Sequence, residues 1–245
     1  MTYVEGFIVA VPTARREDYR RHAESAVAIF EEFGLRRMVE CWGSDVPDGE
    51  TTSFAKAVQA KPDETVVFSW FEHASREARD AFNEKMMADP RMEAMGTNMP
   101  FDGKRMVMGG FAPLLDEGTG RGAFVDGLVL PVPHGNREAY LALAQKAAAD
   151  FQSYGALRLV EAWGDDLPDG QVTDFRRAVK AEAGENVVFS WIEWPDKATR
   201  DAGWGKMMAD PNRSDHPKDL FDGTRMFWGG FDVILDKSAA QKEPS

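Results

Sequence analysis

The sequence predicts an α+β fold in which two βαββαβ modules of similar sequence pair within one chain. Three observations support this fold class: the chain carries one pattern twice, each copy alternates strand-like and helix-like stretches, and each copy is expected to leave one apolar sheet face uncovered. The chain has 245 residues, which suits two domains of about 100 to 150 residues. Its composition, 43% hydrophobic and 29% charged, is typical of a globular protein with a packed core.

The duplication is visible when the two halves are compared directly. Adding 121 to a residue number in the first half gives its counterpart in the second, up to about residue 91; one residue is then lost and the offset becomes 120. MVECWGSDVPDG at 38–49 thus matches LVEAWGDDLPDG at 159–170, and roughly half of the paired positions are identical. The period is too long for a solenoid, so we interpret it as a tandem domain duplication. The predicted division is a first repeat over 1–116, a linker over 117–123, a second repeat over 124–237 and a flexible tail over 238–245.

Each element of the first copy has its own sequence signal. The apolar run VEGFIVAV at 4–11 predicts a strand. Apolar residues at helical spacing over 19–33 predict a helix, and Gly34 follows where a helix C-terminus belongs. Residues 36–42 and 66–72 are rich in branched and aromatic side chains and predict two further strands.

The remaining elements follow in order. Ser75 is a good N-cap for a second helix, which should end near Pro90 because proline disfavours helix in the residue before it. A last strand is predicted over 105–115. Residues 52–60 also look extended and could form a hairpin with 66–72, but the partner of this segment is left open. In the second copy the corresponding signals are Asp196, Pro211 and the strand over 225–235.

This βαββαβ order is that of a ferredoxin-like module, with two helices on one sheet face and the other face open. A large apolar face rarely stays in water. The linker EGTGRGA spans at most about 25 Å, so the second copy is the nearest cover for the first. We therefore expect the two halves to associate as a pseudo-two-fold pair, while further oligomerisation of the whole chain is left open.

Charge and composition exclude several classes of partner. With 41 acidic and 29 basic residues the formal net charge is -12, so the average surface field repels nucleic acids and anionic lipids. The N-terminus lacks the basic region of a signal peptide, and no stretch approaches the ~18 apolar residues of a membrane span. The single cysteine, Cys41, cannot form an internal disulfide. The sequence predicts a cytoplasmic protein with no nucleic-acid or membrane partner.

The motifs VECW, SDVPDG, VVFSW, KMMADP, PFDGKRM and GGF follow one another in the first half. They resemble the YbaA-like family, domain of unknown function 1428, of the dimeric α+β barrel superfamily. The resemblance covers nearly all of each half and implies that the two sheets pack into a barrel, here between halves of one chain. It implies no activity, because the wider superfamily includes cofactor-free monooxygenases, haem-degrading enzymes, isomerases and small ligand-binding or stress proteins. The second copy departs from the pattern over 212–220, so the equivalence of the two pockets is left open.

Strand alternation selects the candidate ligand-binding residues. We expect the face that carries Glu40 and Trp42, and the face that carries Trp70 and Glu72, to line the barrel interior. A carboxyl group among aromatic rings has a raised pKa and can act as a general acid or base. Arginines on the last strand could pair with a glutamate or hold an anionic ligand. The candidates are Glu40, Trp42, Trp70, Glu72 and Arg105, with their counterparts Glu161, Trp163, Trp191, Glu193 and Arg225.

The same residues also fit a structural role, as strand ends near solvent or as buried ion pairs that fix the register of the barrel. No cofactor or metal site is expected. His22, His73, His134 and His216 have no histidine counterpart in the other copy, and the chain has no cysteine pair, HExxH or P-loop.

We therefore expect a small-molecule-binding protein with an aromatic, carboxylate-lined barrel pocket in each half; whether it is a cofactor-independent enzyme is left open. A non-enzymatic structural or stress-related protein is the alternative. RNA binding through the sheet would need exposed aromatic and basic residues, and the acid excess disfavours it. An enclosed cavity of about 300 Å³ or more lined by Glu40 and Glu161 would favour a ligand site, whereas solid packing around them would exclude it.

Overall fold

The computed structural model describes residues 2–210 and 219–239. The elements of the first half are β1 (Tyr3–Pro12), η1 (Thr13–Arg15), α1 (Arg16–Phe33), β2 (Arg37–Asp45), α2 (Phe54–Ala57), β3 (Glu64–His73), α3 (Arg76–Ala88), α4 (Pro90–Gly96), η2 (Gly103–Arg105) and β4 (Val107–Gly118). Those of the second half are β5 (Phe124–Pro133), η3 (His134–Asn136), α5 (Arg137–Ser153), β6 (Arg158–Asp166), α6 (Phe175–Ala178), β7 (Glu185–Trp194), α7 (Lys197–Ala209) and β8 (Phe227–Ser238).

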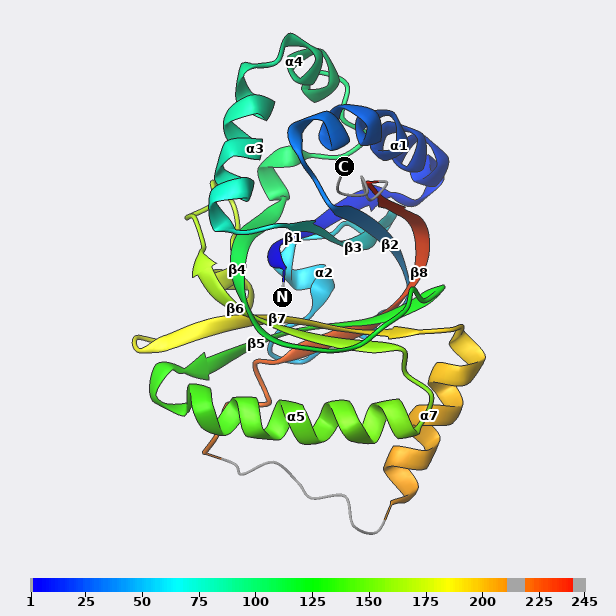
Figure 1. Ribbon diagram of the computed structural model, residues 1–245, viewed down its shortest axis with the longest axis vertical. Helices are drawn as coiled ribbons and strands as arrows, with labels where there is room; N and C mark the ends of the chain where they lie inside the picture. Colours follow the sequence, from blue (N-terminus) through cyan, green and yellow to red (C-terminus); the bar gives the residue numbers. More distant parts are fainter. Residues whose placement is uncertain (1, 211–218, 240–245) are drawn as a thin grey trace, which may run out of the picture.

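The strands form one closed barrel in the order β1-β3-β2-β8-β5-β7-β6-β4. Helices α1 and α3 cover the first half of the barrel, and α5 and α7 cover the opposite side (Figure 1). The predicted fold is confirmed: two ferredoxin-like modules pair within one chain as an α+β barrel. Among the described residues no helix is both long and apolar enough to cross a membrane.

Two antiparallel ladders join the halves. β2 pairs with β8, and β4 pairs with β6. Each module therefore gives its two edge strands to the other, and the barrel has no free strand edge. β4 continues to Gly118, which pairs with Arg158, so the strand extends two residues into the segment predicted as a linker.

Helix boundaries follow the local signals. α1 ends at Gly34, whose φ of 101° is in the left-handed region that glycine adopts without strain. Ser75 and Asp196 cap α3 and α7, because their side chains accept hydrogen bonds from the backbone N–H groups of Ala78 and Thr199. α3 ends at Ala88, as predicted from Pro90. A further short helix, α4, begins at Pro90, because proline is favoured at the first position of a helix; the sequence pattern did not predict it.

The prediction that residues 52–60 are extended is wrong. Phe54–Ala57 form the short helix α2, whose cap residue Ser53 accepts a 3.1 Å hydrogen bond from the backbone N–H of Lys56. α2 and its counterpart α6 follow the ends of β2 and β6, and they close that end of the barrel; the Thr173 hydroxyl donates to the Ala57 carbonyl at 2.6 Å. A helix of four residues shows no helical periodicity, so the sequence pattern could not reveal it.

The barrel interior is a single core that both halves share. Phe68 stacks on Phe189 with ring centroids 4.6 Å apart, and Trp70 stacks on Trp191 at 4.5 Å. All four side chains are fully buried. The prediction of one aromatic barrel pocket in each half is therefore wrong, because the equivalent aromatic rings fill the space by packing on each other. The segment over 212–218, where the second copy departs from the family pattern, and the predicted tail beyond residue 239 lie outside the described residues.

Candidate functional site

The face of β2 that lines the barrel is the opposite of the one predicted. Val39 and Cys41 belong to the barrel core, together with Trp70. Glu40 and Trp42 point instead into the layer between the sheet and the helices, and Glu161 and Trp163 on β6 do the same. The reason is space: the large rings of β3 and β7 fill the narrow interior, so the neighbouring strands contribute their small side chains there.

Glu40 is held in a buried hydrogen-bonded group under α1. The Tyr19 hydroxyl donates to Glu40 Oε2 at 2.6 Å, and the Ser69 hydroxyl donates to the same oxygen. Burial raises the pKa of Glu40 to about 7, although both hydrogen bonds act in the lowering direction. Ordered protein groups therefore surround this carboxyl group, which is only 4% exposed.

Glu161 has the matching environment under α5. The Tyr140 hydroxyl donates to Glu161 Oε2 at 2.7 Å, and burial again raises the pKa of the carboxyl group to about 7. Glu161 also lines a cavity, whose volume is about 130 Å³. This is below the 300 Å³ set as a criterion for a shared ligand site lined by both glutamates, so that hypothesis does not hold for the pair.

Arg105 and Arg225 lie at the closed end of the barrel, away from these glutamates. The strand β4 begins at Val107, so Arg105 belongs to the turn η2 and not to the last strand as predicted. Arg105 bonds Glu64 through both terminal nitrogens, at 2.8 and 2.6 Å, and holds the pKa of Glu64 down at about 2. Arg225 bonds Glu185 in the same way at 2.6 and 2.7 Å. Glu40, Glu72 and Arg105 thus occupy three separate environments and do not form one pocket.

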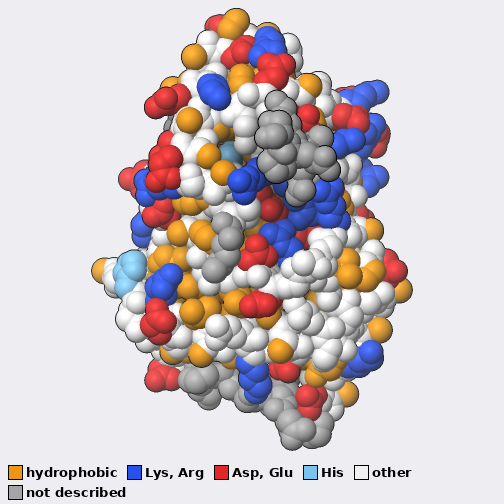
Figure 2. Space-filling model, in the orientation of Figure 1, with side chains coloured by type: hydrophobic (Ala, Val, Ile, Leu, Met, Phe, Trp, Pro, Cys, Tyr) orange, Lys and Arg blue, Asp and Glu red, His pale blue; other side chains and the backbone are white. Residues whose placement is uncertain are grey.

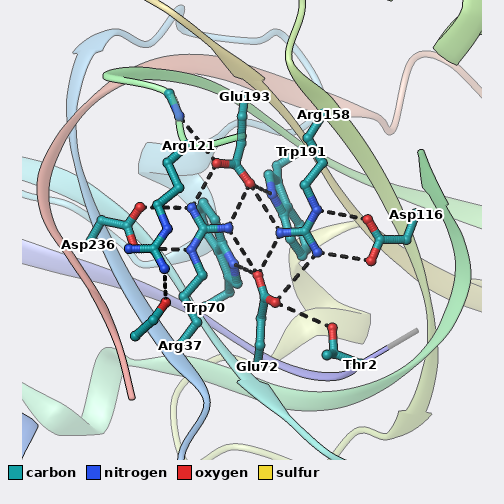
Figure 3. A network of polar contacts seen from close by, with 12 residues as sticks. Thr2, Arg37, Trp70, Glu72, Asp116, Arg121, Arg158, Trp191, Glu193 and Asp236 are labelled. Carbon is teal, nitrogen blue, oxygen red and sulfur yellow. Dashed lines mark hydrogen bonds and ion pairs between the residues drawn. The ribbon is translucent and has the colours of Figure 1, made fainter. Parts of the chain in front are cut away.

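Four of the predicted residues do come together, at the other end of the barrel. Glu72 and Glu193 face each other across two arginines, next to the stacked indoles of Trp70 and Trp191 (Figure 3). The Trp70 Nε1–H donates to Glu72 Oε1 at 3.1 Å, and the Trp191 Nε1–H donates to Glu193 Oε1 at 3.2 Å. The tandem symmetry therefore places two carboxylates, one from each half, at a single site.

Two arginines crosslink these glutamates. Arg37 donates to both oxygens of Glu193 at 2.9 and 2.8 Å and to Glu72 at 3.2 Å. Arg158 donates to Glu72 at 2.7 Å and to Glu193 at 3.3 Å. Each guanidinium group also lies over an indole, Arg37 over Trp70 at 5.6 Å and Arg158 over Trp191 at 5.8 Å, within cation–π range. Each arginine thus bonds carboxylates from both halves (Figure 3).

Two aspartates hold the outer edges of the guanidinium groups. Asp236 accepts from Nε and Nη2 of Arg37 at 3.0 and 2.9 Å, and Asp116 accepts from the same atoms of Arg158 at 2.8 and 2.9 Å. These two-point pairs also cross between the halves. We call the group the mouth network; it consists of Arg37, Trp70, Glu72, Asp116, Arg158, Trp191, Glu193 and Asp236.

Sequence reasoning missed both arginines and both aspartates. A signal was present, because Arg37 matches Arg158 at the offset of 121, and Asp116 matches Asp236 at the offset of 120. Burial alone would raise the pKa of Glu72, but the hydrogen bond and charge of Arg158, with the charge of Arg37, outweigh it and hold this pKa below its usual value. The Glu72 carboxylate is therefore expected to be ionised at neutral pH.

The mouth network forms the floor of a cavity of about 1040 Å³, which we call the mouth cavity. Figure 2 shows Lys and Arg side chains gathered beside Asp and Glu near the middle of this face of the molecule. Two further arginines line the cavity outside the network. Arg121 contacts Ser238 and lies 3.8 Å from Asp236. Arg36 is exposed, and its guanidinium group has no hydrogen bond or ion pair with other described residues.

The two remaining predicted tryptophans, Trp42 and Trp163, make structural contacts with arginines. Trp42 lies 5.8 Å below the guanidinium group of Arg16, and Trp163 lies 5.7 Å from that of Arg137. Within residues 2–210 and 219–239, no three His, Cys, Asp or Glu side chains cluster so that they could hold a metal ion. The charged residues among the described lining of the mouth cavity are arginines and carboxylates.

Comparisons with known proteins agree with this architecture. Residues 2–103 and 123–223 each match the model of the family described as "Protein of unknown function (DUF1428)". The uncharacterised protein YbaA of Escherichia coli K12 is 57% identical over 117 residues, which are 48% of this chain and all of YbaA, and the Shigella flexneri protein of that name matches equally well.

Two solved structures show the same fold over nearly the whole chain. One, from Fusobacterium nucleatum, is named a "Putative monooxygenase"; it is 11% identical with a TM-score of 0.61 and covers 97% of this chain and 94% of its own. The other, a "putative monooxygenase" from Lactobacillus acidophilus, is 12% identical with a TM-score of 0.56 and covers 98% of both chains. At such identities the likeness concerns the fold alone. The two family matches in one chain and the full-length match to YbaA show that this protein belongs to the DUF1428 family, as a tandem duplication of its module.

Proposed function

We propose that the protein is a cytoplasmic small-molecule-binding protein and that the mouth cavity takes a small anionic ligand. The observation that carries the proposal is the exposed Arg36 guanidinium, which has no partner among the described residues at the edge of a cavity of about 1040 Å³. A cavity of this size suits a small molecule. Arginine is the side chain best suited to hold a carboxylate or phosphate by two parallel hydrogen bonds.

The charges that line the cavity favour an anion at its outer part. Among the residues that the structure describes, four arginines and two acidic residues line it. Arg37 and Arg158 are already paired inside the mouth network, so their donors are largely used. Arg36 and Arg121 are the groups left to contact a ligand, and the ordered network beneath would give them a rigid base. A preorganised floor lowers the entropic cost of binding.

Solved structures with this fold include proteins named as monooxygenases. A monooxygenase must bind a small molecule, and the mouth cavity supports that binding step. No reaction is assigned to the chain, because no described group at the cavity is both free of a partner and placed to transfer a proton.

The saturation of the mouth network favours a second candidate, a purely structural role. Its arginines and carboxylates are paired with one another, and the pairs link β2 to β8 and β4 to β6 across the halves. Such a buried network could fix the register of the barrel without any ligand. The two candidates differ in what they require of Arg36 and Arg121, which contribute little to the network.

The test is a titration of the full chain with sodium benzoate and with inorganic phosphate, followed by calorimetry and by amide chemical shifts. We expect saturable binding of at least one anion, weakened ten-fold or more in the double variant Arg36→Ala, Arg121→Ala. Raising the salt concentration should weaken binding too, because the arginines are near solvent. The control is Arg176→Ala on α6, at the other end of the barrel, which removes one positive charge where the double variant removes two, and it should leave the affinity unchanged.

A wild-type chain that binds neither anion, or a double variant that binds both as well as the wild type does, would exclude the anion site. Glu72→Gln separates the structural role from the binding role. It leaves Arg36 and Arg121 in place but breaks the network. If the network has only a structural role, this variant is less stable than the wild type, and neither the variant nor the wild type binds an anion.

A further inference from the structure

The second half contains a cavity that the first half has filled. It lies between α5 and the sheet formed by β5, β6 and β7, on the side of the sheet away from the barrel interior, and has a volume of about 130 Å³. Its walls are apolar, with leucine, isoleucine, alanine and phenylalanine side chains. Three polar groups meet in it, from Tyr140, Glu161 and Ser190. We call it the helix–sheet cavity.

Two substitutions between the halves explain why the cavity is on one side only. Leu128 and Ile192 line it, and their counterparts in the first half are Phe7 and Phe71. The Phe7 and Phe71 rings pack on each other with centroids 4.8 Å apart, and Phe71 also contacts Phe30 at 5.5 Å. The larger rings thus occupy the space that is left open beside α5.

The polar groups are otherwise matched in the two halves. Tyr19 holds Glu40 as Tyr140 holds Glu161, at 2.6 and 2.7 Å. The first half therefore provides an internal control in which the same carboxyl group is buried without a cavity. In the second half, Tyr140 and Glu161 line the cavity, so a small ligand inside it could contact both side chains.

We propose that the helix–sheet cavity binds a small uncharged molecule, about the size of a benzene ring, that carries one hydroxyl group. An apolar cavity of ~150 Å³ in another protein holds benzene, so 130 Å³ admits a ring of that size with little to spare. No lysine or arginine of the described residues lines this cavity, so these residues offer nothing to neutralise an anion. The hydroxyl group of the ligand would hydrogen-bond with the Tyr140–Glu161 pair, while the ring contacts the leucine and isoleucine side chains.

This site is independent of the mouth cavity, which lies at the barrel end and takes its charge from arginines. Its ligand chemistry is also different, since the walls are apolar and the polar groups are few. Apolar walls with a few convergent polar groups are the usual lining of a specific small-molecule site, and the volume of about 130 Å³ restricts the ligand to a single ring. Glu161 is a positioning group here, because no bond-forming step is proposed.

The experiment uses phenol as the probe, with benzene and benzoate as companions, on the full chain at pH 6 and measured by NMR titration of the Ile192 and Leu128 methyl groups. We expect saturable binding of phenol at one site per chain, binding of benzene at least three-fold weaker, and no shift of these methyl groups by benzoate. The double variant Leu128→Phe, Ile192→Phe carries the residues of the first half and should weaken phenol binding at least ten-fold.

The reverse exchange gives a second variant that does not depend on the first. Phe7→Leu with Phe71→Ile should open the matching cavity under α1 and raise the stoichiometry from one phenol per chain to two. Glu161→Gln should keep the cavity but reduce the preference for phenol over benzene to less than two-fold. Arg36→Ala with Arg121→Ala is the control, and phenol binding should stay unchanged in it.

Absence of saturable phenol binding by the wild-type chain would overturn the proposal. So would binding that persists undiminished in the folded Leu128→Phe, Ile192→Phe variant, because the ligand would then lie elsewhere. Methyl shifts produced equally by benzoate would show that the cavity does not select against charge, and would also overturn it.

Discussion

The helix layers of the two halves differ more than the barrel that they share. Under α3, the first half buries His73 against Phe82, with ring centroids 5.1 Å apart. Under α7, the corresponding pair is Trp194 and Gly203. The indole ring comes within 2.8 Å of the place that a Cβ of Gly203 would take. In the first half, Phe82 of helix α3 fills this space. In the second half, Trp194 of strand β7 fills it instead.

The hydrogen-bond partners of Trp194 and of its counterpart His73 differ as well. The Trp194 Nε1–H donates to Asp126 at 2.9 Å, and Arg200 donates to the same carboxylate at 2.8 Å. In the first half, neither ring nitrogen of His73 has a hydrogen bond, and the nearest Glu5 oxygen is 3.6 Å away. The comparison teaches that the duplicated module keeps the shared core alike and lets the outer layers diverge, here with the lost volume replaced from a neighbouring element.

Truncating the shared core should have the largest effect, and a similar one in both halves. Trp70→Ala and Trp191→Ala should each lower the free energy of unfolding by about 3–5 kcal/mol, the usual cost of removing a large buried aromatic side chain. The two indoles stack on each other at 4.5 Å, so the double variant should lose less than the sum of the single losses. Urea unfolding at pH 7 measures all three. Single losses that differ by more than about 2 kcal/mol would show that the core is not shared equally.

The buried glutamates should give the next largest effect, through pH. Burial raises the pKa of Glu40 and of Glu161 from 4.5 to about 7, so between these values the folded chain binds more protons than the unfolded chain. Each carboxyl group therefore contributes less stability as the pH rises from about 5 to 8, by about 2–3 kcal/mol. This contribution is constant again above the folded-state pKa.

Glu40→Gln and Glu161→Gln should each remove that pH dependence. The stability of either variant relative to the wild type should rise by about 2–3 kcal/mol between pH 5 and pH 8, measured by urea unfolding at both values. Using the difference between variant and wild type cancels the other carboxylates, such as Glu64, that titrate at lower pH. A rise in one variant and not in the other would break the equivalence of the two tyrosine–glutamate pairs.

Two glycines of α7 should give smaller effects of opposite sign. No atom of the described residues lies within 4 Å of the place that a Cβ of Gly205 would take, so Gly205→Ala should stabilise the helix by about 1 kcal/mol. Gly203→Ala should instead destabilise it by about 1–3 kcal/mol, because its Cβ would lie 2.8 Å from the Trp194 ring. Thermal unfolding of the two variants measures the difference.

The control for this pair is Trp194→His, which introduces the residue of the first half. In that background Gly203→Ala should become stabilising, since the ring that collides with its Cβ is gone. If Gly203→Ala stays destabilising with histidine at position 194, the volume exchange between the halves is not what distinguishes them.

The sequence was enough to predict the fold because the signals were local and repeated. The apolar runs, the glycine after α1 and the cap residues Ser75 and Asp196 each act within a few residues, and the second copy repeats them. The face of β2 could not be predicted in the same way. Alternation separates Glu40 from Cys41, but both faces of this strand are buried, one under a helix and one in the barrel, so hydrophobic pattern does not tell them apart.

The candidate site was harder to predict because long-range register creates it. Arg37 meets Asp236, 199 residues away, only because β2 pairs with β8 in one particular register. Glu72 and Glu193 were predicted from their aromatic neighbours, but their arginine partners come from the other strands at the barrel end. The clues in the sequence were the identities between the copies, Arg37 with Arg158 and Asp116 with Asp236, but many structural positions are identical in the same way.

The two ladders that cross between the halves have a consequence for how such a protein can evolve. In a barrel closed by two separate and identical chains, every substitution is made twice, and any new cavity opens on both sides at once. Fusion of the two modules removes this constraint, because β2 with β8 and β4 with β6 keep the barrel closed while each half accumulates changes of its own. One half can then remain solidly packed and carry the stability, while the other gains the freedom to try new ligands.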